Sequence, residues 1–357
     1  MAGELPETNQ SHEIAWPMPV LFEIFIIACG AIMKGLFIPG VTELGASSDS
    51  FPSGIVIPGA NFMTLPPGEW VDLSDIDLTS SALDYRVSFS CASNHAYYSA
   101  DGTIQFAAPD VWPLEYRNGV AVGRHEPEPQ RTNLISYSEN LAAWNVNPVV
   151  TGITKTGPNN PYGEKSYAVA VSAIVNSGVF TKSQVSAGQR YTISMAGISG
   201  DSRMMLIGNG YLGTEIVNVN FRQKTSTLSS PFTWRFNDVN TEWVRYAFTG
   251  DSTGSGTRAT VIYSAVALAG SYSCAMVQHE SGAFATSPII TNGISATRAA
   301  AFATVQNPGG LASAIMVHYS DNTSEQLEIP TNSPSIQLPQ SANDWGKRYI
   351  QRIEYIR

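Results

Sequence analysis

The sequence predicts an all-β protein built around an antiparallel β-sandwich, and three observations predict it. Only 14% of the residues are charged, while 30 are glycine and 21 proline, a balance typical of short strands joined by many turns. Tight-turn dipeptides such as Asn118-Gly119 lie between runs of strand-forming residues. No segment has sustained helical spacing of apolar residues except 138–144, where we expect a single helical turn.

Length and charge restrict the classes of function. A chain of 357 residues can form two or three domains, each with its own core. The net charge is −9 and the basic residues are scattered, so we expect no nucleic-acid partner, because a phosphate groove needs a basic stripe. Cys29, Cys91 and Cys274 are odd in number and far apart. They indicate neither a disulfide framework nor a metal knuckle, but reduced thiols in a protein made in a cytoplasm.

The first 70 residues contain the most apolar part of the chain, residues 15–41. Glu23 and Lys34 leave only 24–33 uncharged between them, whereas a membrane-spanning helix needs about 20 apolar residues. We therefore expect no membrane span but a buried strand pair or a short helix. An apolar surface of this kind typically marks an interface, so residues 1–70 are predicted to dock onto other subunits or copies. The candidate docking residues are Phe22, Phe25, Ile26, Leu36, Phe37 and Ile38.

Residues 71–130 are predicted to form a collar of two hairpins and a strap. Asp101-Gly102 and Asn118-Gly119 each lie between short strand-like runs, and both dipeptides favour a type I′ turn. The sequence Glu126-Pro127-Glu128-Pro129 follows. Its alternating prolines remove backbone donors and favour an extended, stiff segment.

Residues 131–300 are predicted to be the sandwich, because strand-like runs recur at short intervals with turn residues between them. Tyr191, Ile193 and Met195 alternate with Thr192 and Ser194, so the two sets should point to opposite faces of a strand. The expected strands are 166–171, 178–182, 190–198, 203–207, 215–221, 232–236, 243–248, 259–269 and 272–278.

Residues 301–357 are predicted to be a small separate β unit, either a cap or a second docking surface. Its strand-like runs are 314–319, 326–329, 335–338 and 349–356.

Motifs for catalysis or cofactor binding are incomplete, and we assign no catalytic residue and no cofactor. Residues 208–213 match GxGxxG, but 214–221 alternate like a strand where a phosphate site needs a helix. Gly200-Asp201-Ser202 resembles the nucleophile block of an esterase family, yet none of the five histidines follows an aspartate at the required spacing of three.

Local metal motifs are absent as well, since the histidines never pair at i,i+2 or i,i+4. Asp72, Asp75 and Asp77 share a short loop. They could hold a structural calcium ion, or they form an acidic, solvated turn, which we favour.

Two blocks of residues, which frame 86–300, carry a resemblance to a known family. The pattern resembles a segment widespread in structural proteins of tailed bacterial viruses, in which a hairpin runs through a proline strap into a jelly roll of the carbohydrate-binding type. Cys91 stands where that pattern has arginine, and Trp112-Pro113 where it has proline-arginine. The first block comprises Phe89-Ser90, Ala92-Ser93, Tyr97, Ala100-Asp101-Gly102, Glu128 to Leu134 and Tyr137-Ser138-Glu139. The second comprises Gln278, Glu280, Gly282, Phe284, Thr286 to Ile290 and Thr297 to Ala300.

The resemblance implies a bacteriophage virion protein of the tail-fibre or appendage type, without enzymatic activity. Its implied partners are other virion proteins of the tail, neck or capsid, host surface polysaccharide, and further copies of itself, for which we expect a trimer. One alternative is a capsid-decoration, head-fibre or neck protein that uses the same module for subunit contacts. Another is a polysaccharide-degrading tailspike, but that class needs paired carboxylates and a repeat that the chain lacks.

Sugar binding needs aromatic faces and planar polar groups. Four aromatic residues lie near expected loops or strand ends, and two neighbouring polar residues could supply hydrogen bonds. The alternative is that the aromatic rings are core residues, as most are in β-sandwiches. The candidate glycan-binding residues are Trp144, Tyr162, Tyr211, Trp234, Arg235 and Asn209.

Overall fold

The computed structural model describes residues 71–147, 149–201, 203, 205–209, 217–228 and 231–357, and the backbone of 25–28, 31–34, 62–64 and 70. The chain divides into two compact units, Met1–Ser53 and Gly54–Arg357. In the first, β1 (Phe25–Ala28) pairs antiparallel with β2 (Ala31–Lys34), so the apolar segment contains a strand pair. In the second, β3 (Phe62–Thr64) pairs with β4 (Trp70–Asp72).

The predicted docking surface stays a prediction. Phe25 and Ile26 are described only as backbone of β1. Phe22, Leu36, Phe37 and Ile38 lie outside the described residues.

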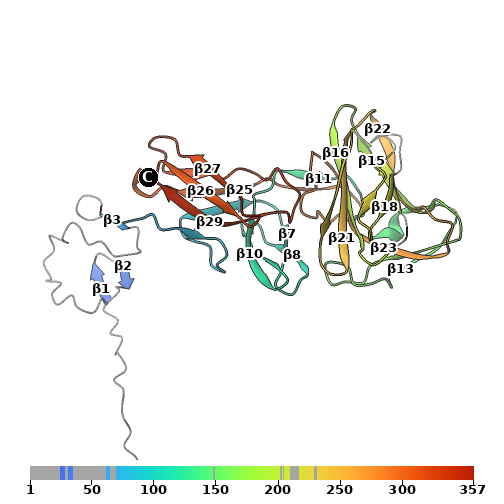
Figure 1. Ribbon diagram of the computed structural model, residues 1–357, viewed down its shortest axis with the longest axis horizontal. Coiled ribbons are helices and arrows are strands. Elements are labelled where there is room, and N and C mark those ends of the chain that lie inside the picture. The colour runs from blue at the N-terminus through green and yellow to red at the C-terminus, as the bar shows by residue number, and fades with distance from the viewer. Residues whose placement is uncertain are drawn as a thin grey trace, which may run out of the picture. The chain divides into compact units, whose positions relative to one another are not determined.

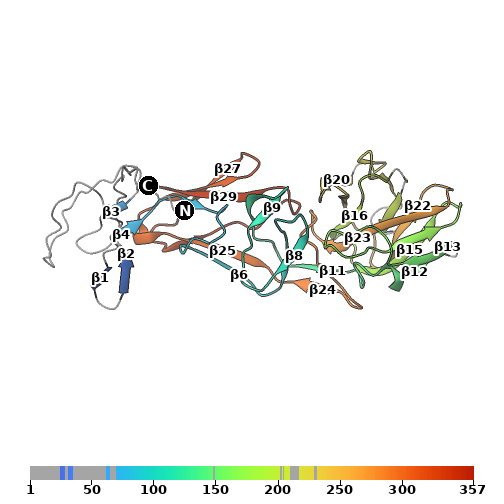
Figure 2. The ribbon, with the colours of Figure 1, turned by 90° about the horizontal axis from the view of Figure 1, so that it is seen from below.

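The predicted all-β sandwich is confirmed: two six-stranded antiparallel sheets pack face to face (Figures 1 and 2). The chain passes several times from one sheet to the other, as in a jelly roll. The first sheet is ordered β12 (Asn145–Val146), β15 (Ser177–Val185), β22 (Gly256–Ser264), β17 (Met205–Asn209), β18 (Val217–Asn220) and β19 (Thr225–Ser226). The second is ordered β13 (Val150–Thr154), β14 (Ala168–Val171), β23 (Gly270–Ser281), β16 (Arg190–Ile198), β21 (Trp243–Asp251) and β20 (Thr233–Asp238).

The sandwich core lies between the sheets, where Val179 and Ile262 of the first meet Ile193 and Phe248 of the second. The predicted helical turn is present as the 3₁₀ helix η1 (Leu141–Ala143), which closes one end of this core through Leu141.

The outer face of the second sheet is buried too. Thr192 and Ser194 point away from the core, as expected, yet they are 0% and 1% exposed. Thr192 Oγ1 donates to the carbonyl oxygen of Gly282 at 3.0 Å. Arg245 donates to Ser194 Oγ at 2.8 Å and to the Thr286 carbonyl at 2.7 Å. The segment after β23 therefore covers this face with satisfied polar contacts instead of water.

The collar and the C-terminal segment form one body. Its larger sheet is ordered β27 (Ser324–Glu328), β26 (Ala314–Tyr319), β29 (Tyr349–Ile356), β10 (Val120–His125) and β9 (Glu115–Arg117), and β5 (Ile76–Asp77) also pairs with β29. Its smaller sheet is ordered β28 (Ser335–Gln337), β25 (Ala301–Gln306) and β6 (Val87–Cys91), and the 3₁₀ helix η2 (Pro308–Gly310) follows β25.

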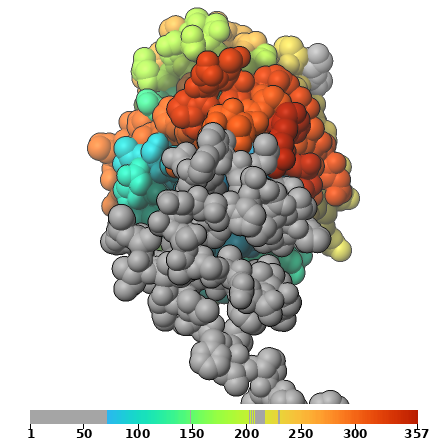
Figure 3. Space-filling view, turned by 90° about the vertical axis from the view of Figure 1, so that its left-hand side faces the viewer, coloured from blue at the N-terminus to red at the C-terminus, as the bar shows by residue number. Residues whose placement is uncertain are grey.

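The separate C-terminal unit predicted from the sequence is therefore wrong. Ile76 and Val87 share one core with Val305, Ile315 and Ile353, because β29 has neighbours from both ends of the second unit. The C-terminal strands, in orange to red, form part of the surface in Figure 3.

The hairpin turns follow their local sequences with one difference. Asn118 and Gly119 both have positive φ, 51° and 76°, which is the predicted type I′ turn between β9 and β10. Between β7 (His95–Tyr98) and β8 (Ile104–Ala107), only Gly102 has a positive φ. The Asp101 carboxylate accepts from the Thr103 amide at 2.9 Å, which stabilises a longer turn than the one predicted.

Within the described residues, no helix has the length and apolar character that crossing a bilayer requires.

Candidate functional site

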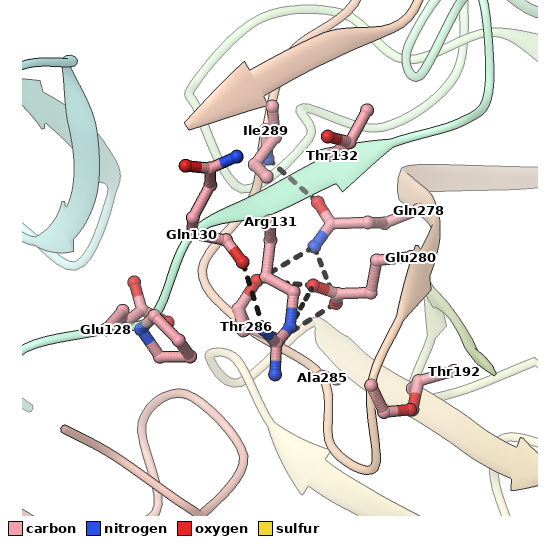
Figure 4. Close-up of polar contacts among 12 residues, drawn as sticks. Glu128, Gln130, Arg131, Thr132, Thr192, Gln278, Glu280, Ala285, Thr286 and Ile289 are labelled. Carbon is pink, nitrogen blue, oxygen red and sulfur yellow. Dashed lines mark hydrogen bonds and ion pairs between the residues drawn. The ribbon is translucent and has the colours of Figure 1, made fainter. Parts of the chain in front are cut away.

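The two blocks of the resemblance meet in a joint between the strap and the sandwich. Strand β11 (Arg131–Asn133) pairs with β24 (Ala296–Arg298), with Arg131 opposite Arg298. The chain between residues 278 and 290 packs against the same strap. The matching residues are distant in sequence, yet they form the two sides of one contact (Figure 4).

Glu128 is the buried anion of this joint. Its carboxylate lies 2.8 Å from Arg298 Nη1 and accepts the Ser287 amide at 2.7 Å. Burial raises the pKa of Glu128, but the charges of Arg298 and His125 and the Ser287 donors outweigh it, so the net pKa is below the usual range. The ion pair is desolvated and holds strap and sandwich together.

A second network surrounds Glu280, which is fully buried. Its carboxylate accepts from Gln278 Nε2 at 2.8 Å and from the Thr286 amide at 3.0 Å, and Arg131 Nε lies 3.7 Å away. Figure 4 shows Arg131 reaching from the strap toward Glu280. Burial raises the pKa of Glu280, and the hydrogen bonds partly oppose that rise.

Asn133 also belongs to the joint, and both the N–H groups and the oxygen of its side-chain amide form hydrogen bonds. It donates to the carbonyls of Val277 and Ile289 at 3.1 and 3.0 Å. Its oxygen accepts the amides of Ile135 and His279, both at 3.1 Å. No shorter or apolar side chain makes these four bonds, so the asparagine has a structural role.

The strap's other glutamate, Glu126, contacts the body that the collar and the C-terminal segment form. Glu126 accepts from Arg348 at 2.6 Å and from Ser341 Oγ at 3.3 Å, which are both C-terminal residues. Alternate carboxylates of the strap thus bind the C-terminal body and the sandwich. These side chains are buried in protein contacts, so the joint is a scaffold rather than a binding site.

An open cleft of about 920 Å³ lies beside the joint. One wall is the β7–β8 hairpin with Gln105 and Phe106, and another is the loop 155–167 with Tyr162 and Lys165. The third is the segment 288–298, and Glu139 and Asn140 line the cleft from before η1.

The loop that carries Tyr162 is held by its own hydrogen bonds. Asn160 Oδ1 accepts the amides of Tyr162 and Glu164 at 3.1 and 3.0 Å. The Asn160 amide donates to the Glu164 carbonyl at 2.6 Å. The Ile104 amide of the facing hairpin donates to the Pro161 carbonyl at 2.8 Å. This loop presents Tyr162 in a fixed position, where its ring stacks on Phe106 with centroids 5.8 Å apart.

Asn140 Oδ1 and Arg298 Nε, on two residues that line the cleft, are buried without a hydrogen-bond partner, while the Tyr162 hydroxyl interacts with the Glu139 carboxyl group. The Asn140 side chain makes no cap to η1 although it occupies the N-cap position. Such atoms are rare in folded proteins, because leaving one unsatisfied costs about 1–3 kcal/mol.

Glu139 adds a neutral carboxyl group to the same wall. Its Oε1 accepts the Met276 amide at 2.8 Å, which a bulge in β23 with a φ of 56° at Met276 turns toward it. Burial, with a smaller contribution from Glu164, raises the pKa of Glu139 to about 8. Burial and the neighbouring Glu139 also raise the pKa of Tyr162. Both groups are therefore protonated at neutral pH.

A second cleft of about 1000 Å³ lies on the other side of the same hairpin. Its Lys224 and Asp238 pair with each other at 2.7 Å. Among the described residues lining it, no buried side-chain polar atom lacks a partner. We therefore place the candidate site in the first cleft.

The structure brings one of the sequence-predicted glycan residues into the cleft, Tyr162. Trp144 is a correction: it is 5% exposed, packs in the sandwich core and donates its indole N–H to the Tyr137 carbonyl at 2.7 Å. Trp234 is 37% exposed on the edge strand β20, away from the residues that line the cleft. A position near a loop did not distinguish these three rings.

The predicted polar partners are not available or not described. Arg235 is committed to an ion pair with Asp344 and donates to Thr249 Oγ1 at 3.2 Å, so its role is to attach β20 to the C-terminal segment. Asn209 is described only as backbone of β17, and Tyr211 lies outside the described residues.

Sequence reasoning missed Phe106, Asn140 and Lys165. Phe106 is 39% exposed at the end of a hairpin that the sequence presents as scaffold. One available signal was the position of Asn140, next to the matched triplet 137–139.

The aspartates considered for calcium are engaged elsewhere. Asp72 accepts from Ser74 at 2.9 Å, Asp77 accepts from Thr79 at 2.8 Å, and Asp75 pairs with Arg352. Over the described part of the chain, no three His, Cys, Asp or Glu side chains gather to hold a metal ion.

A hydroxyl–imidazole pair exists but is enclosed. Ser183 Oγ lies 2.7 Å from His279 Nδ1, and the two side chains are 3% and 0% exposed. Burial lowers the pKa of His279 to about 3. Neither residue lines the described clefts, so a substrate cannot reach the pair, and it does not form a nucleophilic site.

Comparison of the chain with protein-family models finds no match, and a search of curated proteins finds none either.

Proposed function

We propose that the protein is a virion structural protein of a tailed bacteriophage, of the tail-fibre or appendage type, and that it binds host surface polysaccharide in the first cleft. The observation that carries the binding is the open cleft of about 920 Å³, which the stacked rings of Phe106 and Tyr162 line together with polar side chains. The virion assignment rests on the two blocks of sequence resemblance.

A sugar satisfies each feature of the cleft. The apolar C–H face of a pyranose ring packs on an aromatic ring, which Phe106 offers at the rim. Sugar hydroxyls both donate and accept, so they pair with exposed polar side chains that line the cleft, such as Gln105. The volume of about 920 Å³ falls in the range of about 300–1,000 Å³ of small-molecule sites, enough for several sugar units.

The proposed role is binding rather than catalysis. An open cleft of this kind binds one sugar segment weakly. Several copies on one particle, for which we expect a trimer, would raise the overall affinity through avidity by about 10²–10⁴.

The test uses the full chain on an array of bacterial surface polysaccharides. We expect Phe106→Ala to weaken binding by about 2- to 12-fold, the worth of one stacking contact. The matched control is Trp234→Ala, an exposed aromatic outside the cleft. Absence of any binding, or an equal loss in the control, would refute the proposal.

One observation favours the alternative, a decoration or neck protein that uses the module for subunit contacts. Val146, Ile174, Val175 and Leu268 are 50–63% exposed. Ile174 and Val175 lie in the turn before β15, and the Asn176 amide that follows donates to Ser264 at the end of β22. Exposed apolar side chains gathered at one end of a sandwich are typical of an interface.

Particle incorporation separates the two candidates. An Ile174→Ser/Val175→Ser double variant should lose its place on the particle if this end cements neighbouring subunits, while Phe106→Ala should not. Normal incorporation of the double variant, with a solution mass unchanged by light scattering, would exclude the alternative.

A further inference from the structure

The first cleft has a charge imbalance at its rim. Arg298 lines it but is neutralised by Glu128 at 2.8 Å. Lys155 pairs with Glu164 at 3.0 Å across the loop. Lys165 is exposed, and within the described part of the chain its ammonium group has no ion-pair partner.

The remaining carboxyl group that lines the cleft is Glu139, and it does not cancel the charge of Lys165. Burial raises the pKa of Glu139 to about 8, so the group is neutral below that pH. The cleft therefore holds one uncompensated positive charge, although the whole chain has a net charge of −9.

The position of Lys165 is fixed by the loop that carries it. Asn159 and Lys165 form an antiparallel bridge, and the amide of the next residue, Ser166, donates to the Pro158 carbonyl at 2.9 Å. Tyr162 lies three residues earlier on the same loop, with its ring against Phe106. A ligand on these rings thus has a cation on the same wall of the cleft.

We infer that the cleft selects an acidic polysaccharide, in which the carboxylate of a uronic or nonulosonic sugar pairs with Lys165 while the sugar ring packs on Phe106. This inference rests on the proposed function and narrows its substrate class. Acidic and neutral sugars share their hydroxyls and their ring faces, so Lys165 is the residue that distinguishes the two classes.

The test compares a polyuronate with its carboxyl-reduced form, which has the same linkages and no charge, alongside the array of bacterial polysaccharides. Affinities of the full chain are measured by biolayer interferometry. We expect Lys165→Gln to weaken binding of acidic glycans about two- to fivefold, the worth of an exposed ion pair, and to leave neutral glycans unchanged. The matched control, Lys182→Gln, changes an exposed lysine of β15 that does not line the cleft, and it should alter neither.

The outcomes separate the two proposals. If the bound glycans are neutral, if the reduced polymer binds as well as the acid, or if Lys182→Gln weakens binding as much as Lys165→Gln, the acidic selectivity is overturned and the binding function stands. If no glycan binds the wild-type chain, both fail. If Lys165→Gln weakens binding of acidic glycans, and Phe106→Ala weakens glycan binding as well, both proposals are supported.

Discussion

Replacing Arg298 by methionine tests whether the strap joint holds the second unit together. The guanidinium lies 2.8 Å from Glu128 Oε2 and donates to the Pro129 carbonyl at 3.0 Å. The two side chains are 2% and 9% exposed. The variant leaves a buried carboxylate without its cation, which costs about 3–5 kcal/mol in other proteins. Glu128 keeps the Ser287 amide, so we expect about 3 kcal/mol here, the lower end of that range.

The assay is urea unfolding monitored by tryptophan fluorescence. The unfolding free energy of the wild type and of the variant must depend on urea concentration with the same slope. The matched control is Arg190→Met, which breaks an ion pair of the same length, 2.8 Å, whose side chains are 52% and 59% exposed. We expect it to change stability little, because solvent screens this exposed pair. A double variant, Arg298→Met with Glu128→Gln, removes the stranded charge and should recover about 1–2 kcal/mol.

Acid titration provides a second readout of the same joint. The folded-state pKa of Glu128 is lowered, so its contribution to stability is present above the unfolded value of 4.5 and is lost as the pH falls through the folded pKa. Arg298→Met should flatten this acid limb. If the variant loses no more stability than the Arg190 control and keeps the wild-type acid limb, the ion pair does not hold the joint and the reasoning is refuted.

Three further changes have defined outcomes. Because the pKa of Glu139 is raised to about 8, its contribution to folding stability is complete below pH 4.5 and is lost as the pH rises to about 8. The unfolding free energy of Glu139→Gln should therefore decline less than that of the wild type over this pH range. An equal decline would contradict the raised pKa. Trp144→Ala should cost about 3–5 kcal/mol in urea unfolding, because it empties a core position; a loss below 1 kcal/mol would mean that the ring is not core. Gly123→Ala should lower the unfolding free energy by about 1–3 kcal/mol, because its φ is 114° and a Cβ would meet the Ile350 carbonyl. The control is Gly152→Ala, where a Cβ meets open space, and its unfolding free energy should change little. Equal losses in the two variants would refute the clash.

Local patterns determined the strands because alternation and turn residues act within a few positions. β16, β26 and β29 begin and end at the residues predicted. The type I′ turn at Asn118-Gly119 likewise depends only on its own backbone angles. The turn at Asp101 differs from the prediction because hydrogen bonds from Ser99 and Thr103 to the Asp101 carboxylate outweigh the preference of Asp-Gly for a type I′ turn.

The candidate site was predictable only in part. Tyr162 and Trp144 are both aromatic residues near loops, and the sequence treats them alike. Burial separates them, because the sandwich core encloses Trp144 while the cleft exposes one side of Tyr162. Phe106 and Lys165 come from segments about 60 residues apart, and nothing local to either one indicates that they share a cleft.

By itself the sequence determined the all-β class, most strands of the sandwich and the extended strap, since each follows from side-chain period, proline and turn chemistry over short distances. Only the tertiary structure decided that Glu126 and Glu128 bind opposite bodies, that β29 joins both ends of the second unit, and which polar atoms are left without partners beside the cleft. The physical reason is that pairing between distant strands and the burial of single polar groups depend on which surfaces meet, and a linear pattern does not contain that information.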